Sequence, residues 1–79
     1  METVRIIKKT TATASALYAI KDQKAWSFCK NLQTARSRAL ETLKKHPGYT
    51  VAIFKIEKKE EKPGDLLRVS LKQVSTLKF

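Results

Sequence analysis

Three segments within the first thirty residues have a side-chain pattern with a period of two, which is typical of β-strands. The alternation predicts strands over three segments, Val4–Lys8, Ser15–Lys21 and Ala25–Lys30. The small polar run Lys9–Thr13 is expected to be a connection, and Asp22-Gln23 a turn.

The third of these strands has two unlike faces. Trp26, Phe28 and Lys30 project to one side, and small residues, including Cys29, project to the other. The small-residue face leaves room for a helix, so Cys29 is expected to be a buried structural thiol.

After Asn31 the period changes to about 3.6 residues, the period of an α-helix. Asn31 is a favourable helix N-cap. The apolar stripe of this helix consists of Leu32, Ala35, Ala39 and Leu43, with Leu40 on its shoulder. Positive charge fills the last turn, where it suits the helix dipole, and Pro47-Gly48 ends the helix.

The remaining third of the chain predicts two more strands. Tyr49–Lys58 is apolar on both faces, which is typical of a central strand. The charged run Lys58–Asp65 contains Pro-Gly and is expected to be a turn. From Leu67 to Leu71 apolar and polar residues alternate again, and the same phase continues weakly towards Phe79.

Together these elements predict an α+β fold with the order β-β-β-α-β-β. A mostly antiparallel sheet with one amphipathic helix packed on it would bury both. A five-stranded OB-like barrel has the same order of elements and is the alternative. Short strands and the lack of a glycine to bend a closing strand favour the open sheet. A chain of 79 residues is expected to form a single small domain over 1–79.

The composition points to a negatively charged partner. Seventeen Lys and Arg oppose seven Asp and Glu, a net charge of +10, which excludes an acidic mimic of DNA. The excess lies between Thr3 and Ile56, because glutamates balance the lysines of the late turn. No apolar run is long enough to span a membrane, and a single cysteine favours a reducing compartment such as the cytoplasm.

Residues that perform catalysis are scarce. His46 is the only histidine, at a helix end where it suits the dipole, and Cys29 is the only cysteine. The two glycines each follow a proline in a turn and make no phosphate-binding loop. We therefore expect no enzyme activity, no cofactor and no metal site.

The basic residues are the best candidates for contacts to a partner. The first choice is the set around the third strand, Lys21, Lys24 and Lys30, and the second is the helix set, Arg36, Arg38, Lys44 and Lys45. Trp26 and Phe28 either stack on bases beside these cations or form the core, and a small domain's need for large apolar side chains favours the core.

Three kinds of partner are compatible with this pattern. The leading expectation is nucleic acid or a nucleic-acid-handling complex, whose phosphates attract a cationic surface. The second is an acidic surface on another protein, for which complementary charge speeds encounter. The third is self-assembly through the final strand, which is expected to present an unpaired edge.

Residues Tyr18–Ile56 resemble a layout common in short basic proteins of phage early regions. The residues that carry this resemblance are an aromatic hairpin (Ala25-Trp26-Ser27-Phe28), a capped helix (Asn31-Leu32-Gln33-Thr34-Ala35), Pro47-Gly48 and a following strand (Val51-Ala52-Ile53-Phe54). The resemblance implies a binding role in the host cytoplasm, against a host enzyme, a defence complex or nucleic acid. It carries over no functional residue, because the quoted positions are fold-forming.

Overall fold

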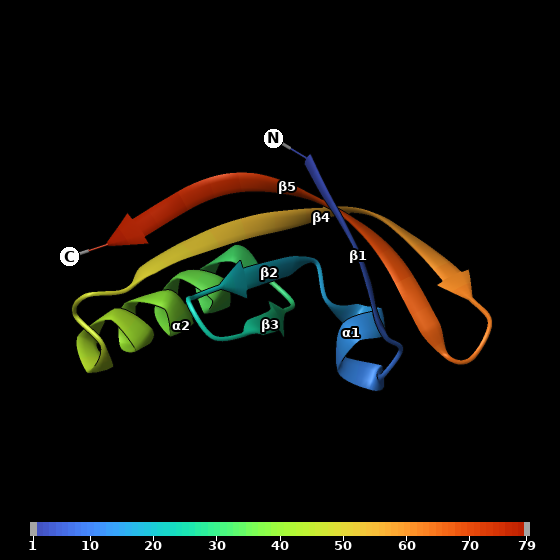
Figure 1. The fold of residues 1–79 in the computed structure, drawn as a ribbon, viewed down its shortest axis with the longest axis horizontal. Helices are drawn as coiled ribbons and strands as arrows, with labels where there is room; N and C mark the ends of the chain where they lie inside the picture. The colour runs from blue at the N-terminus through green and yellow to red at the C-terminus, as the bar shows by residue number, and fades with distance from the viewer. Residues whose placement is uncertain (1, 79) are drawn as a thin grey trace.

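The computed structural model describes residues 2–78 as one antiparallel sheet with two helices (Figure 1). The elements in chain order are β1 (Glu2–Lys8), α1 (Thr11–Ser15), β2 (Tyr18–Lys21), β3 (Trp26–Cys29), α2 (Leu32–Lys45), β4 (Thr50–Lys62) and β5 (Leu66–Lys78). The spatial order of the strands is β1-β5-β4-β2-β3.

This arrangement confirms the predicted α+β fold, in which one amphipathic helix, α2, packs on a five-stranded sheet. The OB-like barrel alternative is wrong, because over residues 2–78 the sheet is not closed and β1 and β3 are its edges. The final strand is an edge only in part. Residues 66–72 of β5 lie between β1 and β4, whereas residues 73–78 pair with β4 alone and leave their other side unpaired, as the sequence predicted for this strand.

The connection predicted over Lys9–Thr13 is wrong at its C-terminal end, where α1 begins at Thr11. Thr10 and Thr13 form a capping box: the Thr10 hydroxyl accepts from the Thr13 amide at 3.1 Å, and the Thr13 hydroxyl accepts from the Thr10 amide at 2.8 Å. This local hydrogen bonding turns residues 11–15 into a helix. Ser15 therefore belongs to α1, and β2 begins only at Tyr18.

The charged turn predicted over Lys58–Asp65 is much shorter than expected. β4 continues to Lys62 and pairs with β5 throughout, which leaves only Pro63, Gly64 and Asp65 in the turn. Gly64 and Asp65 have positive φ angles of 80° and 56°, the left-handed conformation that reverses the chain. The result is a hairpin with two strands of 13 residues, bent at two register shifts into the arch of Figure 1.

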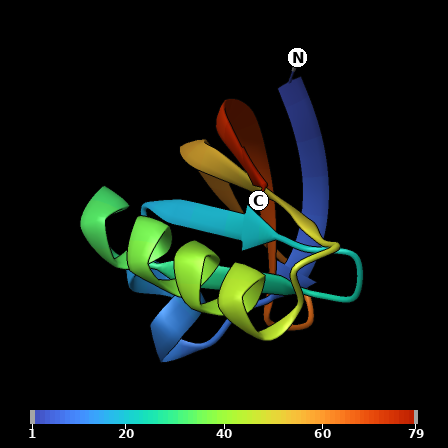
Figure 2. The ribbon, with the colours of Figure 1, turned by 90° about the vertical axis from the view of Figure 1, so that its left-hand side faces the viewer.

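Two apolar cores lie on opposite faces of this sheet. The first lies between α2 and the sheet, where α2 crosses β2, β3 and β4 (Figure 2), and consists of Ile20, Cys29, Ala35, Ala39, Leu43, Val51 and Ile53. We call the face of the sheet that α2 contacts the helix face. Alanines at the contact let α2 approach the sheet closely, and the Asn31 side chain accepts from the Thr34 amide at 2.8 Å, as predicted for the N-cap.

The second core lies on the opposite face, at the end of the sheet nearer β1 and α1. Its buried residues are Ala16, Ala19, Phe54, Ile56, Leu67, Val69 and Leu71. Ile7, Trp26 and Phe28 are partly buried against it. Apolar residues on both faces of β4 confirm its central position, as the sequence predicted.

Candidate nucleic-acid interface

The cations predicted around the third strand are exposed, but they lie at opposite ends of the β2–β3 hairpin. Lys21 pairs with Trp26 at the end that also carries the Lys24 turn. Lys30 follows Cys29 at the other end, beyond the four residues of β3. The structure therefore brings Lys21 and Lys24 together and separates both from Lys30.

The cations predicted on the helix occupy opposite flanks of α2. Arg36 and Lys44 each follow a residue of the buried stripe by one position, about 100° around the helix. Arg38 precedes a stripe residue by one position, and Lys45 lies on the same flank because it is seven residues further on. The two flanks face in different directions, so a small partner surface would contact the cations of only one flank.

Arg38 has a structural contact of its own. Its Nη1 donates to the carbonyl of Phe28 at 3.3 Å and lies 3.6 Å from Sγ of Cys29. This links α2 to the end of β3. Cys29 itself is 4% exposed beneath the helix, as predicted for a structural thiol.

Trp26 lies between the second core and two cations. Its ring packs against the ring of Phe54, with centroids 5.0 Å apart and planes tilted by 43°. The guanidinium of Arg5 lies 4.9 Å from the Trp26 ring centroid, and the ammonium of Lys21 lies 5.6 Å from it. Arg5 belongs to β1 and Trp26 to β3, so the contact shows that the sheet curls until its two edges approach. Sequence reasoning did not select Arg5, whose partner comes from the opposite edge of the sheet.

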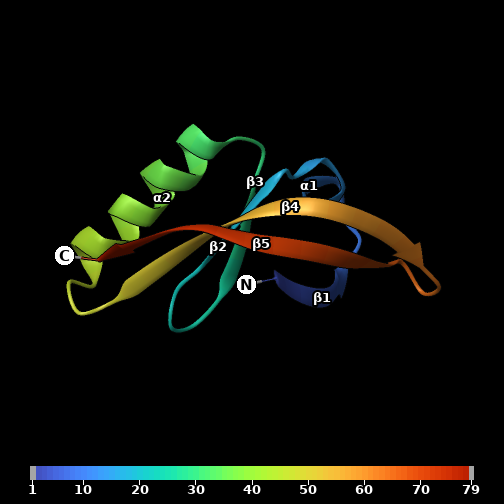
Figure 3. The same cartoon turned by 90° about the horizontal axis from the view of Figure 1, so that it is seen from above.

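A larger group of cations lies outside the two sets that were selected from the sequence. The register of β1, β5 and β4 places six basic side chains on the part of the helix face beyond α2, at the end where β1 lies in Figure 3. We call this surface the basic face; its residues are Lys8, Lys55, Lys58, Lys62, Arg68 and Lys72. All are exposed except Arg68, which is half-buried.

The acidic residues on the basic face do not cancel this charge. Glu60 lies among three cations, 3.4 Å from Lys58, 3.5 Å from Lys62 and 3.3 Å from Arg68. The hydrogen bond and charge of Lys58, followed by the charge of Lys62, hold the pKa of Glu60 below its usual range. Glu57 is exposed at the neighbouring register shift. Six cations therefore meet two carboxylates among the side chains described there.

The late charged run is balanced in sequence but not in space. Strand alternation puts Glu61 on the opposite face, where it pairs with Lys9. Lys59 turns the same way and donates to the carbonyl of Ala14 at 2.7 Å. The prediction that the cationic excess lies between Thr3 and Ile56 is therefore incomplete. The period-two spacing of Lys58, Glu60 and Lys62 carried the missing signal.

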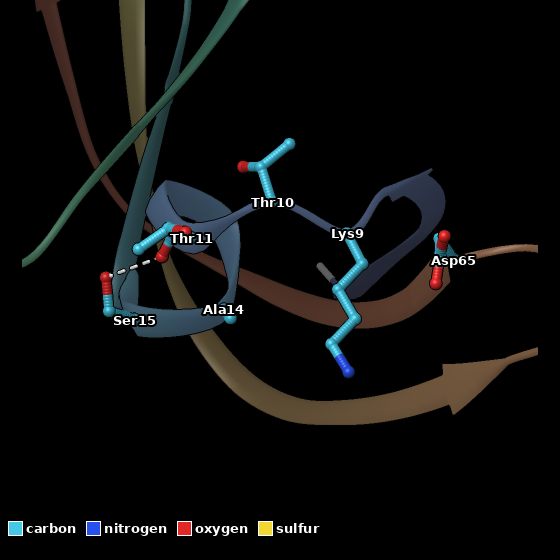
Figure 4. A pocket seen from close by; sticks show the side chains of 6 residues that line it. All are labelled: Lys9, Thr10, Thr11, Ala14, Ser15 and Asp65. Carbon is cyan, nitrogen blue, oxygen red and sulfur yellow. Dashed lines mark hydrogen bonds between the residues drawn. The ribbon is translucent and has the colours of Figure 1, made fainter.

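An open hollow lies beside α1, and several of its polar side chains are bonded within the chain (Figure 4). It is lined by Lys9, Thr10, Thr11, Ala14, Ser15 and Asp65. The ammonium of Lys9 pairs with Glu61, and the Ser15 hydroxyl donates to the Thr11 carbonyl at 3.0 Å. The hollow is wide open to solvent and holds no cluster of groups suited to catalysis.

Other chemistry is sparse over residues 2–78. No group of three or more His, Cys, Asp and Glu side chains is close enough to hold a metal ion in this part of the chain. His46 caps the C-terminus of α2 and stacks on Tyr49, with ring centroids 4.5 Å apart. None of the helices described has the length and apolar character needed to cross a membrane.

Comparison with protein-family models, curated proteins and solved structures finds no match for this chain.

Proposed function

We propose that this protein is a non-enzymatic binding module that holds nucleic acid by its phosphate backbone on the basic face. The observation that supports the proposal is the gathering of six cations on one uncovered sheet face, where one of the two carboxylates described is surrounded by three of them. Cations on alternate residues of a strand are about 7 Å apart, and neighbouring strands are about 4.8 Å apart. Several phosphates of one backbone can therefore be contacted together.

Counterion release is the main source of affinity in this proposal. Each phosphate neutralised by a lysine or arginine lowers the log–log slope of affinity against salt by about 0.9 for duplex DNA and about 0.7 for a single strand. Contact by all six cations would give a slope of about −5 for a duplex and about −4 for a single strand. Such binding has little sequence preference, because no base edge is read.

The test compares charge-matched double variants in a binding titration with labelled duplex and single-stranded oligonucleotides over a salt series. K58Q with K62Q removes two cations from the basic face, and R36Q with K44Q removes two exposed cations from one flank of α2. We expect the first pair to lower duplex affinity by about tenfold at low salt and to flatten the slope by about 2, because two phosphate contacts are lost. The α2 pair should keep the slope of the unmodified protein.

A third double variant, K24Q with K30Q, removes the exposed cations beside β3. Equal losses in all three doubles would show that only the overall charge matters and would overturn the basic face as the site. A loss confined to K24Q with K30Q would place the contact on the hairpin instead. Absence of binding at low ionic strength would overturn the proposed function itself.

Glu60→Gln tests the same surface by a gain of affinity. The substitution removes the carboxylate shared by Lys58, Lys62 and Arg68 and so frees three cations for phosphate. We expect tighter binding and a steeper salt slope, an outcome that partial unfolding cannot mimic. Unchanged or weaker binding by a folded Glu60→Gln protein would contradict phosphate contact at this surface.

A further inference from the structure

We propose that the free edge of β1 binds an extended, acidic segment of another protein as an added strand. β1 pairs with β5 along all seven of its residues, and over residues 2–78 it has no strand on its other side. Alternate N–H and C=O groups of an edge strand point away from the sheet and are available to a second backbone. The edge is continuous, because no register shift interrupts the β1–β5 pairing.

The other edges of the sheet are poorer acceptors. The outer side of β5 is unpaired only over residues 73–78, next to the register shift between Ile53 and Phe54. β3 has only four residues, and both helices contact it. Natural edge strands are usually kept short, covered or interrupted so that they do not pair with other chains. β3 follows that rule, and β1 does not.

The exposed side chains of β1 are apolar on the helix face. Val4 is 46% exposed and Ile6 is 53% exposed, and Leu66 on the neighbouring β5 is 36% exposed. These three residues lie on one face because they alternate with Arg5 and Leu67 in the paired strands. A strand added beside β1 would cover Val4 and Ile6 with its own side chains, in addition to pairing its backbone.

The charge around the edge selects an acidic occupant. Lys8 is exposed at one end of β1 on the helix face, and Arg5 lies on the opposite face at its centre. An added strand therefore fits best when its helix-face residues are apolar beside Val4 and Ile6, its opposite-face residue beside Arg5 is acidic, and a further acidic residue lies at the end beside Lys8. The matching segment alternates apolar and acidic residues.

A second copy of this chain is a worse occupant. Antiparallel pairing of two β1 strands that aligns Val4 with Ile6 of the other copy also places Arg5 directly opposite Arg5, and like charges in that position are unfavourable. Each copy also brings a net charge of +10. Charge complementarity therefore favours an acidic partner over self-association.

The proposal is independent of nucleic-acid binding on the basic face, and one substitution separates the two. Ile6→Lys replaces an exposed apolar side chain with a cation. It should weaken binding of an acidic strand by at least tenfold, roughly the effect of losing a central contact residue. The same change should leave nucleic-acid affinity unchanged or raise it, because it adds positive charge next to Arg68.

The experiment uses the full chain and a labelled peptide that alternates valine and glutamate over about eight residues, near the length of one strand. Two control peptides are an isomer with the valines and glutamates in separate blocks and a version with lysine in place of glutamate. We expect binding of the first peptide only, with slower hydrogen exchange at β1 amides in the complex. Leu40→Lys is the matched control variant, since Leu40 is 45% exposed on α2, away from β1.

Ile6→Thr is a second variant that keeps a β-branched residue while removing apolar surface, and it serves if Ile6→Lys perturbs folding. Equal binding of the block isomer, an equal loss with Leu40→Lys, or exchange protection at β3 instead of β1 would overturn the proposal. So would a dimer seen by sedimentation that Ile6→Thr abolishes, because the occupant would then be a second copy. Failure of the peptide to bind would overturn it while leaving the basic face untouched.

Discussion

Removal of the Trp26 side chain is expected to weaken the fold without abolishing it. The ring is partly buried against the second core, packs on Phe54 and carries Arg5 and Lys21 over its surface. Trp26→Ala therefore removes apolar contact, one aromatic pair and two cation–π contacts in a single change.

The size of the loss follows from these contacts. A fully buried Phe or Trp changed to Ala costs about 3–5 kcal/mol. Because Trp26 keeps part of its surface in solvent, a value near the lower end, about 3 kcal/mol, is expected. The Phe54 ring pair contributes about 1 kcal/mol of this, and the Arg5 contact about 0.5–1 kcal/mol. A chain of this length has a total stability of about 4–12 kcal/mol, so the variant should remain folded.

Urea unfolding followed by far-ultraviolet circular dichroism measures this loss without relying on the fluorophore that the substitution removes. A double-mutant cycle with Arg5→Ala isolates the Arg5–Trp26 term, for which we expect a coupling of about 0.5–1 kcal/mol. Leu40→Ala, at a 45% exposed position on α2, is the control and should change stability by no more than about 0.5 kcal/mol.

A loss below about 1 kcal/mol for Trp26→Ala would refute the reasoning, because it would show that the core does not hold the ring. A coupling near zero would show that the two edge strands are not linked through Arg5. Either result would return Trp26 to the set of residues available for stacking on a base.

Three other substitutions or reactions test separate parts of the structure. Ala39→Leu inserts a large side chain into the fully buried contact between α2 and the sheet, and thermal unfolding should show a loss of about 1–3 kcal/mol. Asp22→Ala removes the carboxylate oxygen that accepts from the amides of Lys24 at 2.7 Å and Ala25 at 2.9 Å, and should cost about 1 kcal/mol at neutral pH. Those two hydrogen bonds hold the pKa of Asp22 below its usual range, so the carboxylate stabilises the fold above the unfolded pKa of about 3.9. The difference between Asp22→Ala and the unmodified protein should therefore shrink as the pH falls below about 4, and a difference that persists at pH 2 would contradict this origin. Cys29 should react with a thiol reagent only as fast as the protein opens, because it is buried beneath α2; rapid reaction of the folded chain would be inconsistent with that position.

Nucleic-acid binding and the position of Trp26 can be examined together. The ring lies on the face opposite the basic face, so oligonucleotide bound to the basic face should leave Trp26 fluorescence largely unchanged. Strong quenching would place the ligand on the opposite face, beside Arg5 and Lys21.

Short-range patterns accounted for most of the individual elements. The N-cap at Asn31, the stripe of Ala35, Ala39 and Leu43, and the apolar alternation of β4 each involve residues within a few positions of one another. Such features depend on local hydrogen bonds and side-chain periodicity, so they are visible in sequence. The same approach missed α1, because the hydroxyls of Thr10 and Thr13 form a capping box in a run that has no helical period of apolar residues.

The sequence by itself determined the elements, the buried stripe of α2 and the cationic excess. Only the tertiary structure decided which cations share a surface. The long β4 strand puts Glu61 on the face opposite Lys58 and Lys62, although all three lie within five residues. Successive side chains of a strand point to opposite faces, so charges that cancel along the chain are separated in space. The pairing of β1 with β5 and of β5 with β4 then brings Lys8, Lys55 and Lys72 onto one face from separate parts of the chain.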